Sequence, residues 1–174
     1  MPNTYTFQVL KDDTQRAIIK ITGSFDGSGQ ESNAARIQAN TLYGALDANN
    51  VPLRSILSTS NTAKPYYGLT IHRLWYDCAN NGDVELYWKA STNKTIFFLN
   101  GNGEYDGNGN WVTIPNNTQN TAGSTGDIGI ATRNMTANDS YVIVMDLRKE
   151  NEYYQRGQFS DPAAFNYGAY GLKP

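Results

Sequence analysis

The residues whose types could support chemistry are few, and the single histidine, His72, and the single cysteine, Cys78, come first among them. Together they could form the nucleophile and base of a cysteine-dependent enzyme. Both fall in one run of β-forming residues, where six residues of extended chain separate them by about 20 Å. A pair so far apart cannot exchange a proton. The sequence therefore predicts a packed strand histidine and a buried, inert thiol.

Carboxylates in the glycine-rich segments are the next candidates. Asp106, Asp127 and Asp139 could offer oxygen ligands to calcium, but their spacing is not that of an EF-hand, and Asn/Asp/Gly segments are ordinary turns. Glu104 and Asp106 could act as a glycosidase pair, but they lie on one predicted turn, whereas such carboxylates face each other across a cleft. One histidine and one cysteine are too few for a zinc cluster. We predict no catalytic residue, no metal site and no cofactor.

Three tryptophans could do a different kind of chemistry. Indole rings stack on sugars, which leaves a glycan-binding module open as an alternative, with Trp75, Trp88 and Trp111 as its candidates. The first two lie in predicted strands, where a large aromatic side chain is most often part of the core. We therefore expect Trp75 and Trp88 to be buried.

The stretch Leu69–Ala90 must position most of these residues. Its two β-rich halves flank Asn81-Gly82, the dipeptide that best tolerates the positive φ angles of a type I′ hairpin turn. Counting outward from that turn predicts three cross-strand pairs: Trp75 with Trp88, Asp77 with Leu86, and Cys78 with Glu85. One face of this hairpin would carry Ile71, Trp75, Val84, Leu86 and Trp88, and the other would carry His72, Leu74, Tyr76, Cys78 and Tyr87. We interpret the hairpin as the scaffold at the middle of a sandwich.

Alternating apolar and polar residues predict further short strands separated by turns. The expected strands are Thr4–Leu10, Gln15–Phe25, Ala35–Ala39, Thr95–Leu99, Trp111–Ile114, Gly126–Thr132 and Ser140–Lys149. Tyr5, Phe7 and Val9 would share one side of the first strand, which pairs with the second as a hairpin. On the last strand, one face would carry Tyr141, Ile143, Met145 and Leu147, and the other would carry Val142 and Val144. Amphipathic helix patterns are almost absent. The sequence therefore predicts an all-β fold, an antiparallel, jelly-roll-like β-sandwich with an extended C-terminal arm.

The composition restricts the classes of partner. Of the 174 residues 39% are hydrophobic and 17% are charged, and the formal net charge is −2. Nucleic acid and anionic membranes would need a basic surface that this chain does not offer. The first residues lack the basic and apolar regions of a signal peptide, and no apolar run approaches the ~20 residues of a membrane span. We expect a soluble protein made in a reducing cytoplasm, binding neither nucleic acid nor membrane.

The character of the chain changes at Glu150. Residues 150–174 carry many aromatic side chains without a period, and disordered segments contain few of them. We therefore divide the chain into a β-sandwich domain, residues 1–149, and an extended aromatic-rich arm, residues 150–174. The arm could pack on its own domain or dock on a neighbouring subunit. The long polar segment Asp47–Pro65 is a second candidate contact region.

Three segments of the chain resemble structural proteins of tailed phages. They are GDVELYWKA at Gly82–Ala90, IFFLNGNGEY at Ile96–Tyr105 and GDIGIATRNMTANDSYVIVMDLRK at Gly126–Lys149. Their shared pattern is a W-x-A strand end, an L-x-G-x-G turn and a GDI…T…N-D-S/T-Y…LRK run, in that order. The similarity is to virion proteins of marine phages that infect cyanobacteria and other bacteria, and it spans Leu69 to Lys149.

The resemblance implies a virion component without enzymatic activity, such as a capsid decoration (cement) protein that binds and stabilises the assembled shell. The major capsid protein or other virion proteins would be its partners, and analogy with capsid-bound β-sandwiches favours a homo-oligomer, in particular a trimer. A head–neck or tail accessory protein and a glycan-binding adhesion module are the alternatives. We expect the partner contacts to include Tyr153, Tyr154, Phe159, Phe165 and Tyr167.

Overall fold

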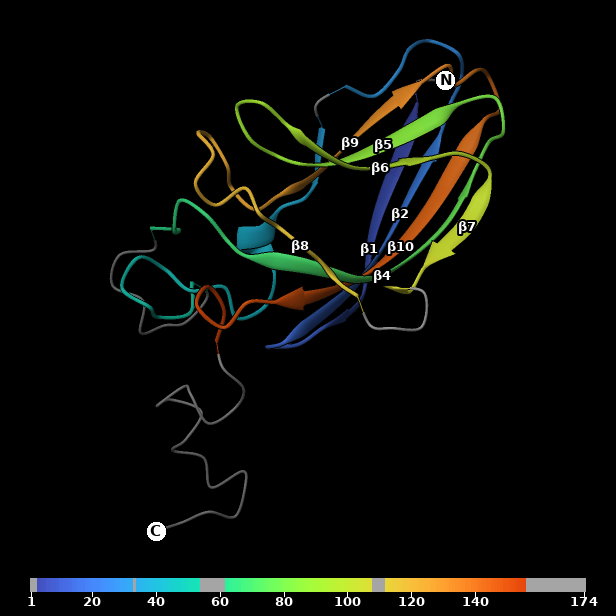
Figure 1. Ribbon diagram of the computed structural model, residues 1–174. Helices are drawn as coiled ribbons and strands as arrows, with labels where there is room; N and C mark the ends of the chain where they lie inside the picture. The colour runs from blue at the N-terminus through green and yellow to red at the C-terminus, as the bar shows by residue number, and fades with distance from the viewer. Residues whose placement is uncertain (1–2, 33, 54–61, 108–111, 156–174) are drawn as a thin grey trace.

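The fold is a sandwich of two antiparallel β-sheets, described by the computed structural model for residues 3–32, 34–53, 62–107 and 112–155. Sheet A has the order β1 (Thr4–Asp12), β2 (Arg16–Ser24), β10 (Ser140–Lys149), β4 (Leu69–Cys78) and β7 (Asn102–Tyr105), and β8 (Ile114–Pro115) pairs with β4. Sheet B has the order β3 (Ala34–Ile37), β9 (Ile128–Arg133), β5 (Asp83–Trp88) and β6 (Lys94–Leu99), and a 3₁₀ turn, η1 (Ala39–Thr41), follows β3. Figure 1 shows β5, β6 and β9 in the upper part of the molecule and β1, β2, β10 and β7 at its right. The predicted antiparallel β-sandwich is confirmed.

The order of the strands is that of a jelly roll. β2, β10, β4 and β7 are neighbours in one sheet, and β3, β9, β5 and β6 are neighbours in the other. From β2 to β5 the chain changes sheet at every strand, and it changes again between β6 and β7, between β8 and β9, and between β9 and β10. Eight strands arranged in this way form the two Greek keys of a jelly roll. β1 is an additional strand, joined to β2 as the predicted hairpin.

The core fills the space between the sheets with alternate side chains of each strand. On β10, Tyr141, Ile143, Met145 and Leu147 face inward and are fully buried, and Val142 and Val144 lie on the opposite face, as predicted. Sheet B contributes inward side chains of β5 and β9, namely Val84, Leu86, Trp88, Ile128 and Ile130. Each fully buried side chain of this size contributes about 1.5–3 kcal/mol to folding.

The predicted hairpin Leu69–Ala90 is wrong. β4 belongs to sheet A and pairs with β10, β7 and β8, whereas β5 belongs to sheet B and pairs with β6 and β9. The expected pairs of Trp75 with Trp88, Asp77 with Leu86 and Cys78 with Glu85 therefore do not form. The turn at Asn81-Gly82 carries the chain from one sheet to the other.

The geometry of that turn explains the error. A type I′ turn needs positive φ at both central residues, and neither Asn81 nor Gly82 has one. Gly82 is needed for space: a Cβ there would lie 2.6 Å from Sδ of Met135 and 3.0 Å from the carbonyl oxygen of Arg133. Asn-Gly thus permits close packing of the β4–β5 connection on the segment after β9, rather than a hairpin.

A β-bulge changes the predicted faces of β4. Opposite Asp146 and Leu147 of β10, the register passes from Arg73 directly to Ile71, so His72 is an extra residue. Extra residues of this kind shift the alternation by one. Leu74, Tyr76 and Cys78 share a face as predicted, but Ile71 lies on that face too. Trp75 points to the outer surface of sheet A, where it is 37% exposed.

The domain continues past residue 149, where the expected arm begins. The amide of Glu150 donates to the carbonyl oxygen of Gly68 (3.1 Å), and the amide of Leu46 donates to the carbonyl oxygen of Tyr153 (2.9 Å). The amide of Gln155 donates to the carbonyl oxygen of Gly44 (2.7 Å). Residues 150–155 are thus tied by backbone hydrogen bonds to segments from the first half of the chain.

Candidate functional site

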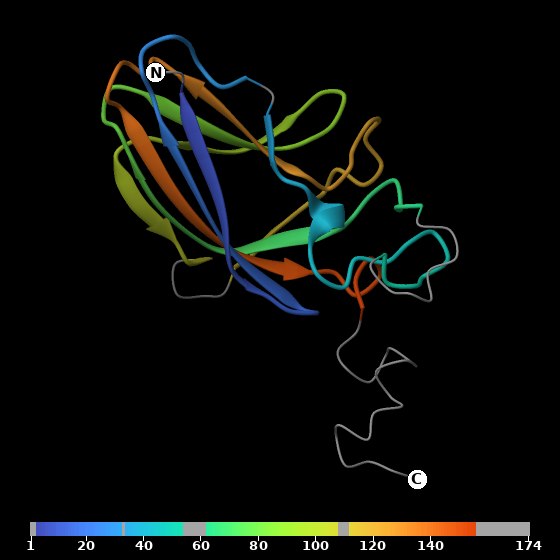
Figure 2. The same ribbon diagram turned by 180° about the vertical axis from the view of Figure 1, so that it is seen from behind.

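The outermost strand of sheet A carries an exposed apolar cluster. Among the described strands β1 pairs with β2 alone, and Figure 2 shows it in dark blue along the border of the sheet. Phe7, Val9 and Leu10 on this strand are 47%, 45% and 51% exposed. We refer to these three residues as the β1 patch. Contiguous exposed apolar side chains of this kind mark surfaces that meet other molecules.

The β1 patch is exposed because sheet B does not reach it. Phe7 and Val9 are the cross-strand partners of Ile21 and Ile19, which are fully buried core residues. Cover is present at the start of β1, where the guanidinium of Arg36 on β3 lies 4.1 Å from the centre of the Tyr5 ring. β3 has only four residues. The side chains beyond Tyr5 therefore face the core side of the sheet without a layer above them.

The edge of β1 is blunted at one end only. Exposed sheet edges invite pairing with another strand, and proteins commonly protect them with bulges and lysines. β1 has both at its end, a bulge between Val9 and Lys11 and the Lys11 side chain, which pairs with Asp13 at 3.0 Å. From Thr4 to Val9 the pairing of β1 with β2 is regular. That part of the edge is the one suited to pair with another chain.

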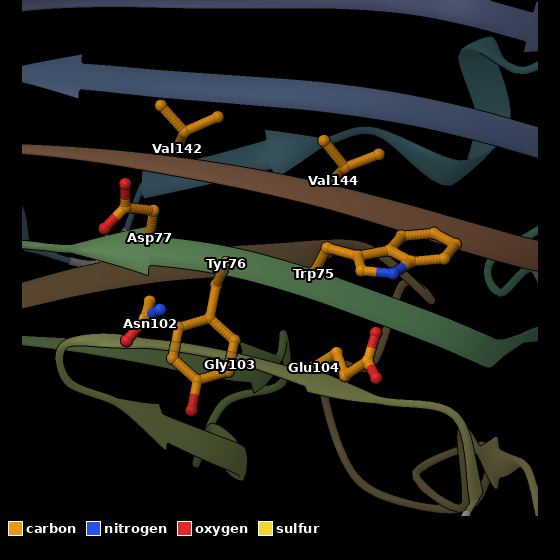
Figure 3. A pocket seen from close by; sticks show the side chains of 8 residues that line it. All are labelled: Trp75, Tyr76, Asp77, Asn102, Gly103, Glu104, Val142 and Val144. Atoms are coloured by element: carbon orange, nitrogen blue, oxygen red, sulfur yellow. The ribbon is translucent and has the colours of Figure 1, made fainter. Parts of the chain in front are cut away.

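A second feature lies on the outer face of sheet A. Trp75, Asp77, Asn102, Glu104, Val142 and Val144 surround a shallow depression of about 490 Å³, and we refer to them as the Trp75 platform. The register places Val144 beside Trp75 and Trp75 beside Glu104, and it places Val142 beside Asp77 and Asp77 beside Asn102. Figure 3 shows the indole ring standing clear of β4, with the side chain of Tyr76 directed to the other side of that strand.

A buried carboxylate borders the platform on the side of the bulge. Asp146 is fully buried, although its strand position faces outward. Arg16 donates to both of its carboxylate oxygens, and Nδ1 of His72 lies 3.5 Å from Oδ2. This group joins β2, β10 and β4 across the outer face of the sheet. Its chemistry is that of a structural ion pair, in which Asp146 is desolvated and compensated by close partners.

The structure keeps His72 and Cys78 apart, as the sequence predicts. His72 lies in the bulge beside Asp146, and Cys78 lies at the far end of β4 with 4% of its surface exposed. Burial, and after it the charge of Asp77, together raise the pKa of the Cys78 thiol to about 12. A thiol with such a pKa carries almost no thiolate at neutral pH and is a poor nucleophile.

The loop carboxylates have structural partners. Oδ1 of Asp127 accepts the amide of Ala39 (2.8 Å), and Oδ2 of Asp139 accepts the amide of Thr136 (2.6 Å). Glu104 is exposed on β7, in the Trp75 platform, and Asp106 follows that strand. In the part of the chain that the structure describes, no three His, Cys, Asp or Glu side chains gather as a metal site.

Two of the five predicted contact residues lie inside the domain. Tyr153 and Tyr154 are 5% and 1% exposed, packed against Tyr66 and Tyr67. The hydroxyl of Tyr154 donates to the carbonyl oxygen of Ala39 (2.8 Å), and its burial holds its pKa well above the ordinary value. The expectation that these two tyrosines contact a partner is therefore corrected: the chain's own residues already cover both rings.

The remaining predicted contact residues, and part of the segment Asp47–Pro65, are not among the residues that the structure describes. Phe159, Phe165, Tyr167 and Trp111 fall outside the described residues. Of the segment Asp47–Pro65, the described ends fold onto the domain: Asp47 is fully buried, and its Oδ1 accepts the amides of Asn49 (2.8 Å) and Val51 (3.0 Å). Contacts through this segment and through the three distal aromatics stay predictions.

Sequence reasoning missed the β1 patch and misplaced Trp75. Alternation places Phe7 and Val9 on one side of their strand, which is correct, but it carries no signal of how far the facing sheet extends. For Trp75 the missing information is the bulge at His72. Two consecutive polar residues, His72 and Arg73, in the middle of the strand are the local feature that could have suggested such an irregularity.

Comparisons with protein-family models, with curated proteins and with solved structures found no match. The resemblance to phage virion proteins therefore stays a prediction. Within the described residues, none of the helical structure is long and apolar enough to cross a membrane. What this chain does has to be inferred from its own surface.

Proposed function

We propose that this chain is a non-enzymatic structural protein of a phage virion, and specifically a decoration protein that binds and stabilises the assembled shell. The observation that carries the proposal is the β1 patch, three half-exposed apolar side chains on a sheet edge that is regular from Thr4 to Val9. Jelly rolls occur in viral capsid proteins and also in lectins and cupins, so the fold is compatible with this role without establishing it.

Docking of the β1 patch would contribute part of the binding energy that such a role needs. Covering the exposed half of Phe7, Val9 and Leu10 would contribute about 2–4 kcal/mol. Strand pairing along Thr4–Val9 would add backbone hydrogen bonds and fix the orientation of the partner, as in other cases of strand addition. The partner is a capsid protein or a second copy of this chain, and the favoured homo-oligomer is a trimer.

The absence of enzymatic activity is part of the proposal and has its own support. The thiol of Cys78 is buried and protonated, and the imidazole of His72 lies beside the Asp146–Arg16 ion pair. Both groups are thereby occupied by the scaffold. A head–neck or tail accessory protein would use the same surface, and the symmetry of the bound protein would distinguish them, with threefold sites for a decoration protein and a ring for the neck or tail.

Sedimentation of virions tests the proposal. Particles from a phage lysate are banded in a density gradient in the presence of tagged wild-type protein, the double variant Phe7→Thr/Val9→Thr, or the control Phe98→Thr. Phe98 is 57% exposed on β6, so the control removes an exposed aromatic ring elsewhere. We expect wild type and control to band with the particles and the double variant to lose most of its binding. Equal binding of all three, or no binding of wild type, would contradict the proposal.

The arm needs a separate test, whose boundary the structure now sets. A deletion that starts at Tyr153 would remove two core side chains and damage the domain. A deletion of residues 156–174 keeps both tyrosines and removes Phe159, Phe165 and Tyr167. Reduced banding of this variant with the particles would support these three residues as contacts, and unchanged banding would remove them from the proposal.

A further inference from the structure

The Trp75 platform combines features that the β1 patch lacks. Trp75 is 37% exposed and Val142 36% exposed, and the other members on β4 and β7 are polar: Asp77, Asn102 and Glu104. The platform faces outward from sheet A, whereas Phe7 and Val9 face the core side of the same sheet. It is therefore a separate surface, with a chemistry of its own.

We infer that the Trp75 platform binds a neutral oligosaccharide. An indole face offers an apolar, electron-rich surface to the C–H groups of a pyranose ring, and such contacts orient the sugar. Carboxylates only accept hydrogen bonds, and sugar hydroxyls are donors that can satisfy them. The side chains of Asp77, Asn102 and Glu104 are exposed, and none of them has a hydrogen bond or ion pair to another described residue that would have to break on binding.

The arrangement of the side chains fits an extended ligand. One cross-strand row runs from Lys20 on β2 through Val144 and Trp75 to Glu104 on β7. Its ends are about 14 Å apart, three strand spacings of about 4.8 Å. A short oligosaccharide can lie along this row with one ring on Trp75. Figure 3 shows the nitrogen-bearing edge of the indole on the side of the Glu104 carboxylate, so apolar and polar groups meet at one point.

The charges of the platform favour some sugars over others, and they disfavour a protein partner. Asp77 and Glu104 flank the ring and would repel the carboxylate of a sialic acid seated on Trp75. Lys20, the cation of the row, lies two strands away at its far end, so the position on the ring favours uncharged hexoses and N-acetylhexosamines. The apolar part of the platform is small for a protein interface, because Trp75 and Val142 are its only exposed apolar side chains. Interfaces between proteins bury a larger apolar centre and are depleted of unpaired carboxylates there.

Glycan titrations followed by tryptophan fluorescence test the inference. The probes are short cello-, malto-, galacto- and chito-oligosaccharides, with sialyllactose as the charged counterpart, and the readout is protection from iodide quenching. The difference between wild type and Trp75→Phe isolates the signal of Trp75 from those of the other two tryptophans, Trp88, which is 3% exposed, and Trp111. We expect at least one neutral series to protect Trp75 and to bind, and sialyllactose not to bind.

Three variants decide whether the platform is responsible. We expect Trp75→Ala to weaken binding roughly tenfold or more, Trp75→Tyr to retain part of it, and Glu104→Gln to weaken it less. Phe98→Ala, which removes an exposed ring beside Arg133 on sheet B, should bind like wild type. The inference is overturned if no neutral series binds, if sialyllactose binds best, or if Trp75→Ala binds like wild type. Because particle binding is measured separately with Phe7→Thr/Val9→Thr, failure here leaves the proposed virion role standing.

Discussion

Two segments at opposite ends of the described chain offer large apolar side chains to the same sandwich, and only one of them is covered. Tyr153 and Tyr154 follow β10, where Tyr66, Tyr67 and backbone hydrogen bonds from the first half of the chain enclose them. Phe7 and Val9 lie on β1, beyond the reach of the four-residue strand β3. Both segments carry large apolar side chains, and they differ in whether other parts of the chain cover those side chains.

The comparison separates two uses of apolar surface in one protein. Side chains that the chain covers itself contribute to the free energy of unfolding in isolated protein, and side chains left open contribute only when a partner arrives. Substitutions in the two segments should therefore affect different measurements. The predictions below test that separation, from the largest expected change to the smallest.

Tyr154→Ala should lower the free energy of unfolding by about 3–5 kcal/mol. The ring is 1% exposed and lies 5.7 Å from that of Tyr67, centre to centre, so its removal leaves a cavity. It also removes one of two hydrogen bonds to the carbonyl oxygen of Ala39, which keeps the amide of Leu42 (3.4 Å) as a donor. Urea denaturation followed by tryptophan fluorescence measures the change. Tyr43→Ala, at a tyrosine that is 53% exposed, is the matched control and should change stability little. Equal losses in the two variants would show that cover does not distinguish these sites.

Lys149→Met should cost about 3 kcal/mol. The ammonium group is fully buried and donates to Asp12, to the carbonyl oxygen of Asp13 and to that of Tyr43 (2.8 Å), which ties the end of β1 to β10. Burial lowers the pKa of Lys149, and the carboxylates of Asp12 and Asp13 oppose that effect. Lys20→Met, at a partly exposed lysine in the neighbouring strand β2, is the control for loss of charge alone. A loss of the same size in the control would contradict the assignment.

Glu150→Gln should make the protein more stable at neutral pH and leave it nearly unchanged at acid pH. Burial, and then the charge of Glu152, raise the pKa of Glu150 above its ordinary value of 4.5. A raised pKa means that the folded state binds the proton more tightly, so stability is lost as pH rises from about 4.5 through the folded-state pKa. Thermal unfolding of both proteins across this range measures the difference. A difference that grows toward acid pH would contradict the sign.

Phe7→Thr should change the unfolding free energy of the isolated protein by about 1 kcal/mol or less, because nearly half of the ring is already in water. Threonine, like phenylalanine, is favoured in β-strands, so the strand propensity is retained. The urea experiment used for Tyr154→Ala measures this directly. A loss comparable to that of Tyr154→Ala would show that Phe7 belongs to the core and would end its role as a contact.

The sequence predicts the strands of this protein better than it predicts their sheets. Alternation correctly assigns the inward face of β10 and the hairpin of β1 and β2, because neighbouring residues determine both. The partition of β4 and β5 between two sheets depends on contacts between distant segments, such as Gly82 with Met135, which no local pattern reports. Asn81-Gly82 therefore suggested a hairpin that the fold does not make.

The candidate surfaces were harder to predict than the fold for the same reason. The outward position of Trp75 depends on one extra residue in β4, opposite Asp146 and Leu147. The exposure of Phe7 and Val9 depends on the length of β3, a strand of the other sheet. By contrast, the inert character of Cys78 follows from its place in an apolar strand, which is visible in the sequence.

Hydrogen–deuterium exchange of the amides of Thr4–Val9 tests the central claim most directly. These residues form the regular part of the sheet edge that carries Phe7 and Val9 of the β1 patch. Exchange is measured by mass spectrometry for the isolated protein and for the protein bound to virions. We predict that this segment becomes strongly protected in the bound state, while the peptide around Phe98 exchanges equally in both. Unchanged exchange at Thr4–Val9 in particles that carry the protein would contradict the account.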